Sequence, residues 1–323
     1  AVSGSSSATC ATIARIALPE LKKRGYDERI ALGSLCGSGT LGILIPPSIA
    51  MIVYAVAADV SIIRMFLAGV LPGIMLLLLF SGYLMFWAIR NPDRMPKQTI
   101  HMTFKERLRA SVSLLPVVLL IVAVFMTMMT GLATANEAAA FGVLGALLIA
   151  AFGGNLNWTT LRESLSGALR MTAMIMFILG AASFLTVAMG FTGIPRALSE
   201  WVVSMHLSPY ALIGVLTVIY LALGCALDGV SMIVLTTSIV LPMVQASGFD
   251  PIWFGIYIII MIELAQVPPP LGFNLFVLQS MSGRSIVGIG RSSIPFFLLM
   301  CAATVLLTAF PTIATWLPTY VMR

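Results

Sequence analysis

The stretch GTLGILIPPS, Gly39 to Ser48, decides how the rest of the chain is interpreted. It lies in a run of 29 uncharged residues between Arg29 and Asp59, which is long enough to cross a bilayer at about 1.5 Å per helical residue. Two glycines and a Pro-Pro pair disfavour a continuous helix, because proline lacks the backbone donor and clashes with the preceding turn. Freed carbonyls at membrane depth persist only when buried in protein or lining a polar cavity. The expected break therefore indicates an ion or solute site, and the alternative is a kink that serves packing only.

Composition indicates a protein of the lipid bilayer. Of 323 residues, 59% are hydrophobic and 9% are charged, and the mean hydropathy is +1.04. Further long uncharged runs separate Arg64 from Arg90, Arg109 from Glu137, Glu137 from Arg162, Arg170 from Arg196, Glu200 from Asp228, Asp228 from Asp250, and Arg291 from Arg323. These runs are typical of a polytopic all-α membrane protein and exclude a soluble domain. The sequence lacks the alternation of an outer-membrane barrel, with its segments of about ten residues.

Residues suited to metal, redox or hydrolytic chemistry are sparse. The cysteines and histidines stand singly: Cys10, Cys36, Cys225, Cys301, His101 and His206. Spacings typical of zinc, haem or iron–sulfur ligation are absent from the sequence, as is a GxxxxGK[ST] phosphate loop. The net charge of +6 is spread over short loops, so we attribute it to orientation in the membrane rather than to nucleic-acid binding. The sequence predicts no cofactor and no enzyme.

Basic residues predict which loops face the cytoplasm, namely the turn after Lys22-Lys23-Arg24 and the loop 90–109. The expected elements follow in order: a helix over 8–24, a broken span over 30–38 and 49–57, crossings over 67–89, 113–129 and 137–152, an amphipathic surface helix over 158–170, a crossing over 171–189, a surface helix over 195–209, a re-entrant hairpin over 211–246 with its tip at Asp228, a second broken span over 253–263 and 271–279, and a last crossing over 294–310. Thr134 or Asn136 is expected to cap the helix that begins near Glu137.

An internal repeat organises these elements. A shift of 223 positions aligns structure-setting residues without a gap: Pro19 with Pro242, Gly25 with Gly248, Asp27 with Asp250, Leu41 with Leu264, Pro46-Pro47 with Pro269-Pro270, and Pro72 with Pro295. The turn at Gly25 is flanked by basic residues, whereas the turn at Gly248 has only Asp250, so the two copies are expected to face opposite ways. A hairpin followed by a broken helix, repeated in inverted orientation, is a recurrent architecture of secondary transporters.

The repeat also divides the chain. We expect a first transport repeat over 1–65, a scaffold helix over 66–89, a cytoplasmic loop over 90–110, scaffold and surface helices over 111–210, a second transport repeat over 211–283, and a surface turn, last scaffold helix and tail over 284–323. The offset places Ser5 on Asp228. The sequence is therefore expected to begin at the tip of a hairpin, without that hairpin's first arm.

Four stretches carry a resemblance to a known family. They are SGSSSATCATIARIALPELKKRGY at 3–26, GTLGILIPPS at 39–48, NEAAAFG at 136–142 and PPPLGFNLF at 268–276. Together they resemble the large membrane subunit of tripartite ATP-independent periplasmic (TRAP) transporters, over essentially the whole chain. The chain departs from the family at two places. Thr134-Ala135-Asn136 replaces the usual Thr-Pro-Thr, and Pro268-Pro269-Pro270 replaces Thr-Pro-Pro, which removes one hydroxyl from the second break.

The resemblance implies a fold and a set of partners. The fold is an elevator-type architecture like that of the ion-transporter superfamily, built from inverted repeats with re-entrant hairpins and broken transmembrane helices in the bacterial inner membrane. The partners are a small membrane subunit that braces the scaffold and a periplasmic binding protein that delivers the substrate. Sodium ions would be the coupling ions, and further helices would precede Ala1 in the natural protein.

Repeat and resemblance together predict two sodium sites. Sodium prefers oxygen ligands. The carbonyl groups freed at a helix break, together with hydroxyl groups, supply such ligands without a costly buried carboxylate. The first site is expected at Ser3 and Ser5 with the carbonyls of Gly42, Ile45 and Pro47. The second is expected at Ala226, Asp228, Ala265, Pro268 and Pro270, where Asp228 contributes charge.

The substrate is expected between the two hairpin tips. The polar residues beside the breaks are Ser6, Ser7, Thr40, Ser48 and Asn274, and the helix N-termini there would attract an anion such as a carboxylate. Glu263 joins this set as an ionisable residue inside the membrane, with a boundary position as its alternative. The helix macrodipole is the favoured explanation of Glu137, with a functional role as its alternative, and Arg15 is expected to extend to the inner interface, with pairing to the substrate as its alternative.

These observations predict sodium-coupled import of a small organic anion, a carboxylate or sugar acid. A stand-alone sodium/carboxylate symporter of the same architecture is the first alternative, and it differs only in lacking partners. An ion channel fits less well, because hairpins that close from opposite sides suit alternating access. A membrane enzyme would need a cluster of reactive side chains at one depth, which the sequence does not contain.

Overall fold

A computed structural model describes residues 4–96, 103, 112–154, 156–193, 197, 200–201, 204–205, 208–268 and 272–322. Within these residues every regular element is a helix, which confirms the all-α class. The chain forms two compact units, one of Ala1–Lys97 with Leu179–Arg323 and one of Gln98–Ile178. Five described helices are long and apolar enough to span a membrane, and the bent pair Glu28–Leu44 and Ile49–Ala57 is a further candidate.

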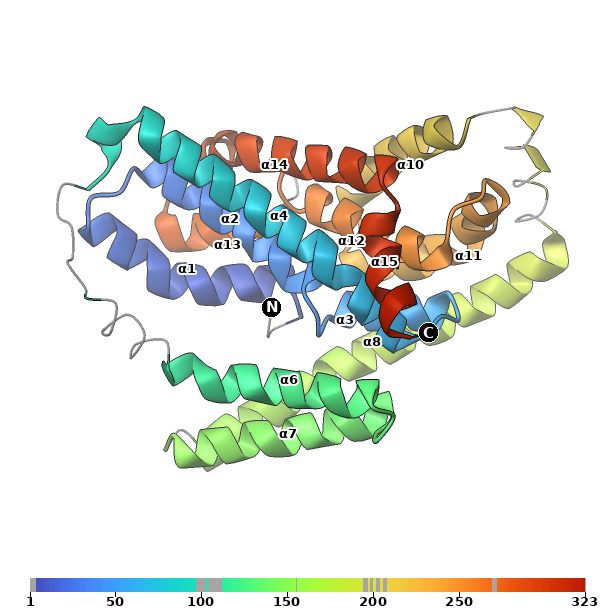
Figure 1. Ribbon diagram of the computed structural model, residues 1–323, viewed down its shortest axis with the longest axis horizontal. Coiled ribbons are helices and arrows are strands. Elements are labelled where there is room, and N and C mark those ends of the chain that lie inside the picture. The colour runs from blue at the N-terminus through green and yellow to red at the C-terminus, as the bar shows by residue number, and fades with distance from the viewer. Residues whose placement is uncertain are drawn as a thin grey trace. The chain divides into compact units, whose positions relative to one another are not determined.

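The first unit contains both copies of the repeat (Figure 1). Its helices are α1 (Ser6–Lys23), α2 (Glu28–Leu44), α3 (Ile49–Ala57), α4 (Ile62–Arg90), η1 (Pro92–Arg94), α10 (Pro209–Gly224), α11 (Gly229–Ala246), α12 (Pro251–Ala265), α13 (Phe273–Ser282), α14 (Ile286–Ala309) and α15 (Thr312–Val321). The sequence had not indicated α15. The expected surface helix over 195–209 lies mostly outside the described residues.

The second unit holds η2 (Val112–Leu114), α6 (Leu115–Met129), α7 (Ala135–Phe152) and the start of α8 (Trp158–Thr192). Thr134 and Glu137 form a capping box at the start of α7, which confirms Thr134 as the cap and explains Glu137 without any transport role. The expected division of residues 158–189 into a surface helix and a separate crossing is wrong, because α8 is continuous. Neither Gly167 nor Arg170 interrupts its hydrogen bonding, and that segment contains no proline.

The predicted break after Gly39 is present but shorter than expected. α2 continues to Leu44, α3 begins at Ile49, and the two helices are bent by 44°. The glycines do not end the helix; they allow a neighbouring helix to approach closely. A Cβ at Gly39 would lie 2.8 Å from Cβ of Cys10, and one at Gly42 would collide with the Thr9 side chain. These two glycines therefore let α1 pack tightly against α2.

The four helices of each copy correspond at the predicted offset. α1 and α11 match residue for residue, and α2, α3 and α4 begin within one residue of the positions that correspond to α12, α13 and α14. Asp27 and Asp250 both cap the following helix through two backbone N–H groups. Gly25 and Gly248 both adopt positive φ angles, 77° and 88°, in the preceding turn. The internal repeat is thus visible in the backbone.

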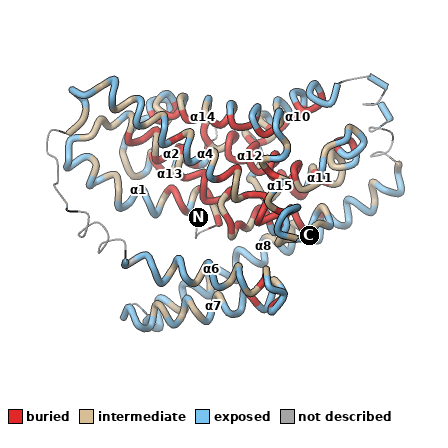
Figure 2. Tube along the Cα trace, viewed as in Figure 1, coloured by how far each residue is buried: buried red, intermediate tan, exposed pale blue. Residues whose placement is uncertain are grey.

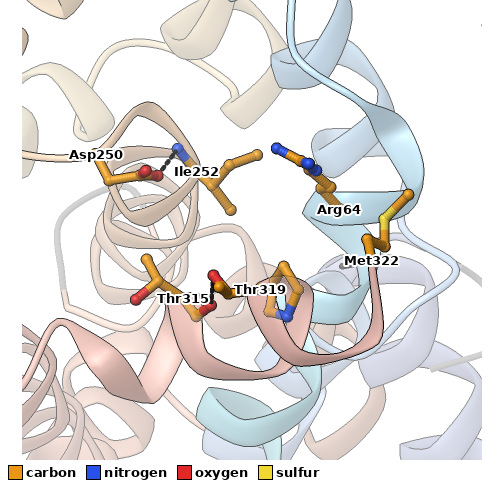
Figure 3. Close-up of a pocket in the computed structure, with 7 residues that line it drawn as sticks. Arg64, Asp250, Ile252, Thr315, Thr319 and Met322 are labelled. Atoms are coloured by element: carbon orange, nitrogen blue, oxygen red, sulfur yellow. Dashed lines mark hydrogen bonds between the residues drawn. The ribbon is translucent and has the colours of Figure 1, made fainter.

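Helix α4 shows that the copies point in opposite directions. Its 29 residues span about 43 Å. Beyond its C-terminal end, Arg94 pairs with Asp27 of the first turn at 3.7 Å. Near its N-terminal end, Arg64 faces a cavity of about 280 Å³ that Asp250 of the second turn also lines (Figure 3). The two equivalent turns therefore lie at opposite ends of one long helix.

The core of this unit lies along α12. Every residue from Trp253 to Ala265 is buried (Figure 2). Helices of both copies pack around it: α2, α3 and α4 from the first, α11 and α14 from the second. In addition, α1 packs on α13 and α11 packs on α3. The equivalent hairpin arms α1 and α11 thus each contact the half-helix of the other copy, as a pseudo-two-fold arrangement requires.

Substitution of Gly39 tests this packing. Gly39→Ala should lower the free energy of unfolding by about 1–3 kcal/mol, because the added methyl group overlaps Cys10. Gly82→Ala is the matched control on α4, since nothing lies within 4 Å of its Cβ position, and it should be neutral or stabilise by about 0.5–1 kcal/mol. Thermal unfolding in detergent measures both variants. Equal effects of the two substitutions would contradict the close approach of α1 and α2.

Candidate functional site

The tip of the first hairpin lies directly on the first break. The Cβ position of Gly4 is 3.3 Å from the Ile49 nitrogen and 3.6 Å from the Pro47 carbonyl oxygen, so a side chain there would be crowded. The Cβ position of Gly42 is 3.3 Å from the Ser5 carbonyl oxygen. The structure thus brings together Ser5, Gly42 and Pro47 of the first predicted sodium site.

The other two members of that site are Ser3 and Ile45. Ser3 lies outside the described residues. The Ile45 side chain packs against α4, 2.9 Å from the Cβ position of Gly73, so only its backbone is available to an ion. Sequence reasoning missed Thr9, whose hydroxyl donates to the Ser5 carbonyl oxygen at 2.8 Å. The spacing of four residues along a helix is the feature that could have indicated it.

A buried polar contact joins the two copies beside this break. Asn274 Nδ2 donates to Ser6 Oγ at 2.9 Å and to the Cys36 carbonyl oxygen at 3.2 Å, and Ser6 Oγ donates to Asn274 Oδ1 at 3.1 Å. Both side chains are buried. Ser6 is the first residue of α1 and Asn274 the second of α13, so two helix N-termini meet at this contact.

The remaining polar residues of the predicted substrate set have local partners. Thr40 is buried and donates to the Gly37 carbonyl oxygen at 2.7 Å. Ser48 is buried and caps α3 by accepting from the Met51 amide at 3.5 Å. Ser7 is half-buried, with its hydroxyl 3.4 Å from that of Ser5. All three lie in or beside the first break, as expected.

The second hairpin tip lies at the end of α12. A Cβ at Gly229 would lie 2.6 Å from the Ile262 side chain, and one at Gly224 would collide with Ala265. Ala226 and Asp228 of the second predicted sodium site are exposed in the tip between α10 and α11, and Pro268 follows α12. Pro270 lies outside the described residues.

Asp228 acts as the cap of α11. Its carboxylate accepts from the Val230 amide at 3.0 Å, from the Ser231 amide at 3.3 Å and from the Ser231 hydroxyl. These bonds place a negative charge on the N-terminus of that helix. In the first copy, the corresponding residue is the uncharged Ser5.

Glu263 lies in the last turn of α12 and is completely buried. Neither carboxylate oxygen has a hydrogen-bond partner within the described part of the chain. The backbone of Leu44, the last residue of α2, makes a polar contact with the carboxylate that is weaker than a normal hydrogen bond. Burial of a charge without a partner costs several kcal/mol or more, so an unpaired carboxylate in a protein core calls for an explanation.

A surface ion pair lies in the first unit, at the end that carries the Gly25 turn. Arg284, between α13 and α14, donates through Nε to Glu28 Oε1 at 3.0 Å and through Nη2 to Glu28 Oε2. The carboxylate raises the pKa of the Arg284 guanidinium above its ordinary value. This pair joins the start of α2 in one copy to the turn after α13 in the other.

Comparison with known proteins identifies the family of this chain. The sequence model described as "Tripartite ATP-independent periplasmic transporter, DctM component" matches residues 1–313. The chain belongs to this family. The TRAP resemblance of its sequence motifs is thereby confirmed, and the chain is a multi-pass membrane protein of the TRAP large-permease type.

Individual relatives carry related names. The C4-dicarboxylate TRAP transporter large permease protein DctM of Vibrio cholerae is 33% identical, over 100% of this chain and 75% of that protein. Its counterpart in Pseudomonas aeruginosa is 30% identical, over 99% and 74%. The ectoine/5-hydroxyectoine TRAP transporter large permease protein UehC of Ruegeria pomeroyi is 29% identical, over 98% and 74%. All three names describe TRAP large permeases; two of them give C4-dicarboxylates as the solute and the third gives ectoine and 5-hydroxyectoine.

Proposed function

We propose that this TRAP large subunit imports a small organic anion, a carboxylate or sugar acid, together with sodium ions. A periplasmic binding protein would deliver the anion, and a small membrane subunit would brace the scaffold in the bacterial inner membrane. Membership of the TRAP family supports the transport function and its partners. The meeting of Ser6 and Asn274 between the two copies is the observation that carries the site assignment.

The first break supports the sodium component. Helix ends leave carbonyl groups without intrahelical partners, and such carbonyls bind sodium in broken transporter helices. Gly4 and Gly42 hold the hairpin tip against the break at van der Waals distance, with the Ser5 and Pro47 carbonyl oxygens close by. An ion held there would tie α1 to the junction of α2 and α3. Its binding would thus favour the closed arrangement of the tip.

The meeting of α1 and α13 supports the anion component. The N-cap residue of α13 is Gly272, which has no side chain to cap the N–H groups of that end. Together the N-termini of α1 and α13 provide partial positive charge next to two buried polar side chains, Ser6 and Asn274. In the symmetric location, α11 is capped by the Asp228 carboxylate. An anionic substrate is therefore attracted to the first location and repelled from the second.

The two copies supply the moving part of the proposed cycle. The hairpin arms α1 and α11 each pack on the half-helix of the opposite copy, so a substrate bound between them would move with both. Displacement of the paired units against the scaffold would then expose the site to each side in turn, as in an elevator mechanism. No nucleotide is required, because the sodium gradient supplies the driving force.

Replacement of sodium by potassium tests the coupling. In proteoliposomes that contain the complete transporter and its binding protein, uptake of the cognate anion should fall to the level of empty vesicles when potassium replaces sodium at equal ionic strength. In this proposal, the carbonyl groups at the helix break bind sodium more tightly than the larger potassium ion. Uptake that persists unchanged in potassium would contradict sodium coupling.

Substitution of Asn274 tests the anion site. Asn274→Asp adds a negative charge beside Ser6 and should raise the KM for the transported anion by about tenfold or more, equivalent to about 1.4 kcal/mol of lost binding. Asn157→Asp is the matched control, because Asn157 is an exposed helix cap that an aspartate can replace. Its KM should equal that of the unmodified protein. Equal KM values for all three proteins would exclude Asn274 from the substrate site.

A further inference from the structure

The unpartnered carboxylate of Glu263 sits where the two broken helices end. α2 and α12 start from turns at opposite ends of α4 and pack against each other. Glu263 lies three residues before the end position Gln266 of α12, and the last residue of α2, Leu44, lies beside it. The C-terminal ends of the two helices therefore meet at this carboxylate.

The ends of α2 and α12 favour a cation beside Glu263. The C-terminal end of a helix carries partial negative charge, and two such ends converge here. The Leu44 backbone makes a polar contact with the carboxylate but does not neutralise its charge. A cation bound here would be stabilised by that charge and by the two helix ends. The arrangement is the opposite of the α1 and α13 N-termini proposed for the anion.

Positive side chains on the neighbouring helices lie elsewhere. Arg64 of α4 lines the cavity with Asp250, which is 13 residues before Glu263 and hence about 20 Å away along α12. On α14, Arg291 precedes Ser292, whose carbonyl oxygen packs at Gly33, in the half of α2 remote from Leu44. On α11, the nearest charged residue is Asp228, which adds further negative charge. Among the described residues, then, no basic group neutralises Glu263.

The equivalent position in the first copy provides a comparison for the Glu263 carboxylate. The position that corresponds to Glu263 in the first copy is Thr40, whose hydroxyl is satisfied by the Gly37 carbonyl oxygen. The fold thus accommodates an uncharged, locally bonded side chain at this place. A buried acid in only one copy points to a ligand rather than to a requirement of packing.

We propose that Glu263 is the charged ligand of a coupling sodium ion held between the ends of α2 and α12. A hard monovalent cation suits one carboxylate together with backbone carbonyls. A divalent ion fits less well, because the described residues contain no cluster of three acidic, histidine or cysteine side chains. Since Glu263 and Leu44 belong to different copies, the ion would bridge the repeat. This inference rests on the proposed sodium coupling and assigns it a charged residue.

The test is a sodium titration of thermal stability. A ligand that binds only the folded state raises Tm with concentration. For the purified chain in detergent, Tm should rise with sodium at constant ionic strength maintained with choline. Glu263→Gln preserves side-chain volume and removes the charge. In the absence of sodium, this variant should have a higher Tm than the unmodified protein. The sodium concentration that gives half of the maximal rise in Tm should increase by about tenfold or more.

Two further variants keep the test decisive. Glu263→Asp retains the charge on a shorter side chain and should retain a sodium response, weakened relative to the unmodified protein. Glu163→Gln removes an exposed carboxylate on α8 and should match the unmodified protein. Superimposable titrations of Glu263→Gln and the unmodified protein would overturn the proposal. A Tm that follows pH but not sodium in the unmodified protein would overturn it as well, in favour of a proton.

Uptake measurements separate failure of this inference from failure of the proposed function. If uptake by the unmodified transporter requires sodium but Glu263→Gln retains the same sodium dependence, the function stands and the role of Glu263 is refuted. If uptake by the unmodified transporter is equal in sodium and potassium, the proposed coupling itself fails.

Discussion

A backbone that breaks inside a membrane must find partners for the polar groups it frees, and most of the first unit is arranged around that constraint. Gly4 and Gly42 allow the tip of α1 to approach the junction of α2 and α3 at van der Waals distance. Asn274 of the other copy reaches the Cys36 carbonyl oxygen and Ser6 in the same region. The break is therefore supported by a hairpin of its own copy and a half-helix of the other.

Inverted symmetry provides two such breaks, and sequence differences give them different chemistry. The N-termini of α1 and α13 meet at uncharged polar residues and would attract an anion, whereas Asp228 caps α11 with its own carboxylate. At the ends of α2 and α12, Thr40 in one copy is replaced by Glu263 in the other. In the proposed cycle, helix N-termini would hold the anion and helix C-termini the cation. The proposed coupling places both within one moving unit.

The sequence was sufficient for some of these features because they depend on local chemistry. Prolines at 46 and 47 correspond to the observed break, and the offset of 223 residues aligned Asp27 with Asp250, which the structure shows as equivalent caps. The length of α2 was not predictable in the same way, because the role of Gly39 depends on Cys10 in another helix. Likewise, the partnership of Ser6 and Asn274 joins residues 268 positions apart. Periodicity also could not distinguish a boundary glutamate from a completely buried one at Glu263, nor show that α8 is continuous.

The central claim is that two equivalent turns of an inverted repeat lie on opposite sides of the membrane. It is tested most directly by labelling single cysteines at Lys23 and Gln245, both exposed beside these turns, in a cysteine-free background with a membrane-impermeant maleimide. The inverted arrangement predicts that the cysteine at position 245 reacts in spheroplasts, in which the outer face of the inner membrane is accessible. The cysteine at position 23 should react only after permeabilisation. Equal reaction of both positions from one side would contradict the inverted repeat and the site built from it.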